Sequence, residues 1–140
     1  MDFDVLSDLN WLAVIVATLA YFALGAVWYA PPVFGNQWMK AAGTSMEGEG
    51  PGPAIYVAPL VFCFLATLAN AMLAVATGSN SVSDGVVLGL VVSVGYGVSL
   101  LGVTAVFESN KPDAVTWGAI TAGYHVVGLL VSAIIVSAWD

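Results

Sequence analysis

The stretch that decides the fold runs from Ala114 to Trp139 and reads AVTWGAITAGYHVVGLLVSAIIVSAW. It contains no Asp, Glu, Lys or Arg. A helix rises about 1.5 Å per residue, so about 20 apolar residues cross the roughly 30 Å of hydrocarbon in a bilayer. The stretch therefore predicts one membrane-spanning helix.

Three further segments have the same character: Trp11–Tyr29, Ala54–Thr77 and Gly85–Phe107. The 140-residue chain is 60% hydrophobic and 8% charged, whereas about a quarter of the residues in a soluble domain are charged. The sequence therefore predicts an all-α fold, a four-helix transmembrane bundle. Residues 1–140 would form a single integral membrane domain.

The first loop is the longest. Pro31 and Pro32 cannot continue a helix and end the first span. Val33–Ala42 then places apolar residues at helical spacing, which predicts a short helix lying in the membrane interface. Gly43–Pro53 is rich in Gly, Pro and acidic residues, which is typical of a flexible connector.

Orientation follows from the two basic residues of the chain, Lys40 and Lys111. Loops that carry Lys or Arg next to a span stay in the cytoplasm. We therefore expect loops 30–53 and 108–113 to be cytoplasmic and both termini to lie outside the cell (plasma) membrane. The net charge of −7 and the lack of Arg argue against nucleic-acid binding.

Small residues recur every four positions in the third span and predict a helix-packing groove: Gly85, Gly89, Ser93 and Gly97. Membrane helices associate through such small residues. The groove would hold another helix of this chain or form a seam between copies.

The fourth span has a semi-polar face that we expect to point into the bundle, formed by Gly118, Thr121, Ala122, His125, Gly128 and Ser132. We expect the opposite face to contact lipid; it carries Val126, Leu129, Leu130 and Ile134.

An ionisable side chain in mid-membrane is a candidate functional residue, and His125 lies there. Tyrosines at similar depth predict a mid-membrane polar cluster of His125, Tyr21, Tyr96 and Tyr124. The cluster would bind a ligand or proton, or contact another subunit. Alternatively, His125 is a neutral core residue that a Tyr hydroxyl satisfies.

The sequence predicts no enzyme, no catalytic residue, no cofactor and no metal site. One His and one Cys make no zinc site, and haem would need a second axial ligand. Ser93–Gly97 reads SVGYG and resembles a potassium-channel filter, but too few residues follow it for another span.

A charged turn formed by Glu108, Lys111 and Asp113 is a solvated loop or a docking site for a partner.

Several short motifs resemble a family of small bacterial membrane proteins, the domain of unknown function seventeen-sixty-one. They are Asn10–Val14, Leu24–Tyr29, Pro32–Gly35, Trp38-Met39, Phe107-Glu108, Lys111-Pro112 and Gly123-Tyr124. The resemblance implies four spans in this order and assigns no activity, substrate or catalytic residue.

A chain rich in packing features and poor in reactive groups indicates a structural or accessory subunit, or a self-assembling membrane component. Its partners would be the lipid bilayer and either other membrane protein subunits or copies of itself. The alternative is a small oligomeric transporter or pore for a small solute, with the span-three groove and His125 lining the path.

Overall fold

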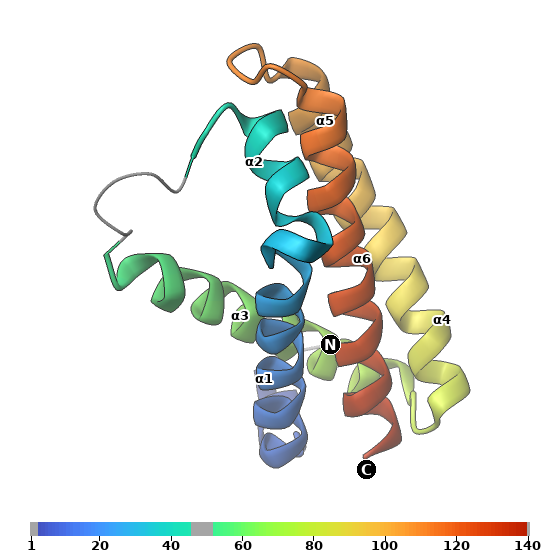
Figure 1. The fold of residues 1–140 in the computed structure, drawn as a ribbon. Coiled ribbons are helices and arrows are strands. Elements are labelled where there is room, and N and C mark those ends of the chain that lie inside the picture. Colours follow the sequence, from blue (N-terminus) through green and yellow to red (C-terminus); the bar gives the residue numbers. More distant parts are fainter. Residues whose placement is uncertain (1–2, 46–51, 140) are drawn as a thin grey trace.

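The computed structural model describes residues 3–45 and 52–139, which form helices joined by short turns (Figure 1). In chain order the elements are η1 (Phe3–Ser7), α1 (Trp11–Trp28), η2 (Pro31–Gly35), α2 (Asn36–Ala42), α3 (Ala54–Thr77), α4 (Val82–Val92), η3 (Ser93–Val98), α5 (Ser99–Phe107) and α6 (Ala114–Ala138). Four helices are long and apolar enough to cross a membrane: α1, α3, the joined α4–η3–α5, and α6. The predicted all-α four-span bundle is confirmed.

The chain passes up and down the bundle, so its loops gather at two ends. At one end the Asn10 side chain donates a hydrogen bond of 2.9 Å to the Trp139 carbonyl. We call this the termini end; the turn at residues 78–81 lies there too (Figure 1). At the opposite end, the connector end, the Asp113 N–H donates to the Ala41 carbonyl at 3.2 Å. The loops that carry Lys40 and Lys111 therefore share one end.

Helix α6 is the centre of the bundle. It contacts α1, α2, α3, α4, η3 and α5. The expectation that one of its faces contacts lipid is wrong, because Leu129 is buried, and Leu130 and Ile134 pack against glycines of α4. Apolar residues on a membrane helix suit lipid and another helix equally well, so composition alone does not distinguish them.

The small residues of the third span form the surface on which α6 packs. A Cβ at Gly85 would lie 2.6 Å from the Cα of Ile134, and a Cβ at Gly89 would lie 2.8 Å from the Cα of Leu130. Ser93 is fully buried, and Gly97 leaves room for Leu129, whose Cδ1 would lie 3.4 Å from an added Cβ. Within this chain, α6 occupies the groove predicted from the sequence.

A strict four-residue repeat does not stay on one face of an α-helix. With 3.6 residues per turn, each four-residue step overshoots by about 40°. The π-helical segment η3 winds more widely than the α-helices on either side of it. Because a π-helix has more residues per turn, each residue in it advances by a smaller angle, which compensates part of the overshoot. Gly97 therefore still faces α6. The SVGYG motif thus lies inside a continuous span and not on a re-entrant loop.

The short helix expected in the first loop is present as η2 and α2. In η2 the Gly35 N–H donates to the Ala30 carbonyl at 3.0 Å, and a Cβ at Gly35 would collide with the Tyr29 carbonyl oxygen, so the turn requires a glycine. Helix α2 packs along the start of α6, where the Trp38 indole donates to the Thr121 hydroxyl at 3.1 Å.

Helix α3 packs against the bundle only along its second part. Buried positions begin at Cys63, whereas residues 54–59 are all exposed. In Figure 1 the first turns of α3 point away from the other helices. In the predicted connector Gly43–Pro53, residues 46–51 lie outside the described residues.

Candidate functional site

The mid-bundle polar cluster centres on a hydrogen bond between α1 and α6. The Tyr21 hydroxyl and the Nδ1 of His125 lie 2.6 Å apart. Gly128, one turn after His125, makes room for the tyrosine, because a Cβ there would overlap the Tyr21 ring. Tyr21 is 2% exposed. The contact therefore joins α1 and α6 through a tyrosine that is almost fully buried.

Tyr124 extends the cluster to α3. Its hydroxyl donates to the Tyr21 carbonyl at 3.3 Å and lies 3.4 Å from the Cys63 Sγ. Because the single hydroxyl proton goes to the carbonyl, the Cys63 thiol is the donor in the second contact. The Tyr124 ring centroid lies 4.7 Å from that of His125 and 5.4 Å from that of Tyr21. Tyr21, Tyr124 and His125 thus form one cluster, which Cys63 joins.

Tyr96 does not belong to this cluster. Its side chain is 65% exposed, and in the described part of the chain no hydrogen bond or ring contact joins it to Tyr21, Tyr124 or His125. Tyr96 lies in η3, on the side of the third span that faces away from α6. The sequence grouped Tyr96 with the others by its expected depth, but depth does not determine the direction in which a side chain points.

A second polar contact, nearer the termini end, ties α3 to α6. The fully buried Asn70 donates to the Leu129 carbonyl at 3.1 Å and to the Ser132 hydroxyl at 2.8 Å. Asn70 thus joins two helices, as polar side chains in membrane helices commonly do. Its Oδ1 and the Oγ1 of Thr67, one turn earlier, are buried without a hydrogen-bond partner among the described residues.

The charged turn at the connector end is held by contacts within the chain. Lys111 lies 3.4 Å from the Glu108 carboxylate and 4.5 Å from the centroid of the Trp117 ring. The Asn110 N–H, and secondarily Lys111, lowers the pKa of Glu108. The Thr116 N–H donates to Asp113 at 3.0 Å and lowers its pKa. Asp113 is thus the N-cap of α6.

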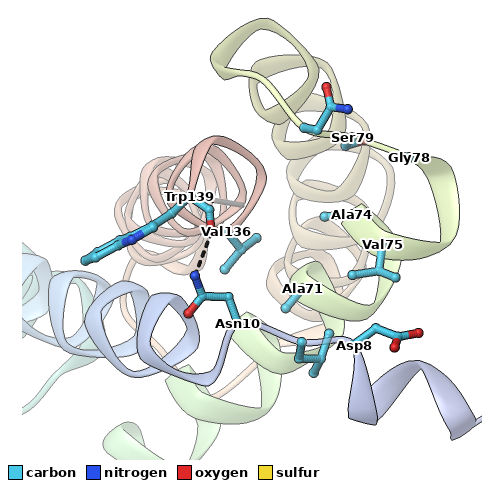
Figure 2. Close-up of a pocket in the computed structure, with 11 residues that line it drawn as sticks. Asp8, Asn10, Ala71, Ala74, Val75, Gly78, Ser79, Val136 and Trp139 are labelled. Atoms are coloured by element: carbon cyan, nitrogen blue, oxygen red, sulfur yellow. Dashed lines mark hydrogen bonds between the residues drawn. The ribbon is translucent and has the colours of Figure 1, made fainter.

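The termini end carries a pocket of about 250 Å³ between the link from η1 to α1 (residues 8–10), the end of α3 and the end of α6 (Figure 2). Figure 2 shows the Asn10 amide bonded to the Trp139 carbonyl, while the Trp139 indole points away from the pocket. Asp8, Ser79 and Asn80 add polar groups. No Lys or Arg lines the pocket, so its charged group is a carboxylate.

The chemistry of the cluster is that of uncharged hydrogen-bonding groups. Over residues 3–45 and 52–139, no three His, Cys, Asp or Glu side chains come close enough together to hold a metal ion. Two members were missed by the sequence reasoning, namely Gly128 as the socket for Tyr21 and Cys63 as a partner of Tyr124. The spacing of Gly128 three residues after His125 placed them on one face but did not identify the ring that fills the space.

Fold and site together define a multi-pass helical membrane protein whose spans are joined by buried polar contacts. Residues 12–137 match the family model described as Protein of unknown function (DUF1761), and the chain belongs to this family. The family resemblance found in the sequence is thereby confirmed. No curated protein and no solved structure matches the chain.

Proposed function

We propose that the protein is a non-enzymatic membrane component, a structural or accessory subunit that assembles with other membrane subunits or with copies of itself. One observation supports this most directly. In the third span, Val82–Phe107, only 11% of an 18-residue apolar segment is buried inside the chain, compared with 33% of the corresponding segment of α6. The third span is therefore largely free to contact something else.

Two outward glycines suggest that its neighbour is a helix as well as lipid. Nothing lies within 4 Å of a Cβ placed at Gly95 or at Gly102. A glycine inside a helix lowers helix stability by about 1 kcal/mol relative to Ala, and neither glycine is needed for packing in this chain. Small residues in membrane helices allow the backbone of a second helix to approach closely.

The buried polar groups support the same role. Tyr21, His125 and Asn70 each form a hydrogen bond between helices, as expected of groups that fix the arrangement of a bundle.

The loops at the connector end carry Lys40 and Lys111, so we place that end in the cytoplasm. Cysteines introduced at Ser45 and Asn80, with the buried Cys63 changed to Ala, should react with a membrane-impermeant reagent from opposite sides. Labelling of both from one side would contradict this orientation.

Assembly is tested by native mass spectrometry of gently solubilised membranes that contain the whole chain. We expect complexes of fixed ratio, with copies of the chain or with a larger partner. Gly102→Leu should reduce these complexes, because the added side chain would hold a partner helix away. Val103→Leu is the matched control, since Val103 is already large and 61% exposed, and it should leave them unchanged. A wild-type chain that is only monomeric and has no partner would contradict the proposal.

A further inference from the structure

The hydrogen bond between Tyr21 and His125 favours one position of the imidazole proton, because Tyr21 is the more deeply buried partner. In the described part of the chain the Tyr21 hydroxyl has one neighbour that can accept its proton, the Nδ1 of His125 at 2.6 Å. If Nδ1 carried the proton, the hydroxyl proton would have no acceptor. The tautomer that satisfies Tyr21 therefore has an Nδ1 acceptor and an Nε2–H donor.

That Nε2–H has no partner within residues 3–45 and 52–139. The buried polar atoms that lack a partner are the Oγ1 of Thr67, the Oδ1 of Asn70 and the Oγ of Ser137, and the Nε2 of His125 is not one of them. Since it has no hydrogen bond to a described residue and is not among these buried atoms, the Nε2 reaches the surface of the chain. His125 lies near the middle of α6, and an unpaired donor in hydrocarbon is strongly unfavourable. An acceptor from outside this copy would relieve that cost.

Tyr96 offers such an acceptor at the same depth. The third span runs antiparallel to α6, with Gly89 against Leu130 and Ala105 against Gly118. Tyr96 lies near the middle of the interval from Gly89 to Ala105. The middle of the interval from Gly118 to Leu130 is the position of Tyr124 and His125. Tyr96 and His125 therefore lie at one level.

Within one copy the Tyr96 hydroxyl is exposed and does not reach His125. The neighbouring Gly95 is exposed, and nothing lies within 4 Å of a Cβ added there. A second helix can therefore approach the backbone closely beside Tyr96. Tyr96 also lies on a π-helical turn, a feature frequent at functional sites. A donor without an acceptor and an exposed hydroxyl at equal depth complement each other between two copies.

We propose that a second copy of this chain completes the mid-bundle cluster, with its Tyr96 hydroxyl accepting a hydrogen bond from the Nε2–H of His125. This inference rests on the assembly proposed above and narrows it to copies of the chain. The cluster predicted from the sequence, with Tyr96 as a member, is then formed across an interface instead of within one chain.

The test measures self-association of the purified full chain in liposomes, by energy transfer between labelled copies at varied protein-to-lipid ratios. Tyr96→Phe removes only the hydroxyl and should weaken association by roughly three- to thirty-fold, the range for hydrogen bonds between membrane helices. Tyr56→Phe is the matched control, because Tyr56 is 64% exposed and lies on the part of α3 that projects from the bundle. It should leave association unchanged.

A double-mutant cycle distinguishes this contact from a general effect on the surface. In a chain that already carries His125→Ala, the further change Tyr96→Phe should have no effect. An equal effect in both backgrounds would overturn the inference. Self-association that Tyr96→Phe leaves unchanged, or assembly only with a different protein, would also overturn it while leaving the proposed function standing. A wild-type chain without any assembly would contradict both.

Discussion

Helix α6 and the third span, Val82–Phe107, are both charge-poor and rich in glycine, yet the fold uses them in opposite ways. Helix α6 is surrounded by the other helices. Of its 18-residue apolar segment, 33% is buried, compared with 11% of the corresponding segment of the third span. Gly118 and Gly128 of α6 each face a side chain of another helix. In the third span Gly85 and Gly89 face α6, but Gly95 and Gly102 have nothing within 4 Å of an added Cβ. In a membrane, a glycine is informative only once its neighbour is known.

The largest effect should come from changing glycines of the two classes to alanine. Gly128→Ala would force the Tyr21 ring out of its socket and strain the contact between α1 and α6, so we expect it to lower the free energy of unfolding by about 2–3 kcal/mol. Gly102→Ala has open space and gains helix propensity, so it should be neutral or stabilising by up to about 1 kcal/mol. Denaturant titration in detergent micelles measures both changes. Equal effects would mean that the two spans are not packed differently.

Polar side chains on the two surfaces should show the same contrast at a smaller scale. Asn70→Ala removes two hydrogen bonds to α6 and should cost about 1–2 kcal/mol of unfolding free energy. Thr104 is exposed on the third span, and its hydroxyl donates within its own helix to the Leu100 carbonyl. Thr104→Val, which keeps the shape of the side chain, should therefore change stability little. A cost for Thr104→Val as large as that for Asn70→Ala would show that burial does not decide the energetics.

The four spans could be predicted from the sequence because their signal is local. A charge-free run of about 20 residues can satisfy its backbone in hydrocarbon only as a helix, and this holds whatever surrounds it. The hydrogen bonds of Asn70 obey a similar rule, since a buried amide in a membrane helix needs a partner. Both are properties of one segment.

The side-chain directions could not be predicted because they depend on neighbours. The π-helical turn at Ser93–Val98 changes which residues face α6, and Tyr96 thereby lies outside the cluster to which its depth assigned it. Leu129 is buried because α6 lies at the centre of the bundle. That position depends on the elements packed around α6 and not on the sequence of α6 itself. The sequence thus predicts which segments are helices but not the direction in which each side chain points.

The smallest effect concerns how the two spans begin. Helix α6 is capped by the Asp113 carboxylate and α4 by the Ser81 hydroxyl. The hydrogen bond from the Thr116 N–H holds the pKa of Asp113 below its ordinary value. The cap therefore stabilises the folded chain fully above the ordinary Asp pKa of about 3.9, and this contribution is lost as the pH falls through the lower pKa of the folded state.

The melting temperature in micelles should accordingly decline as the pH falls below the ordinary Asp pKa of about 3.9, and Asp113→Ser should make this decline shallower, because a hydroxyl can cap α6 without titrating. Glu108, whose pKa is also lowered, should contribute the part of the decline that Asp113→Ser leaves. If Asp113→Ser left the pH profile unchanged, the carboxylate would not be the cap that stabilises the start of α6.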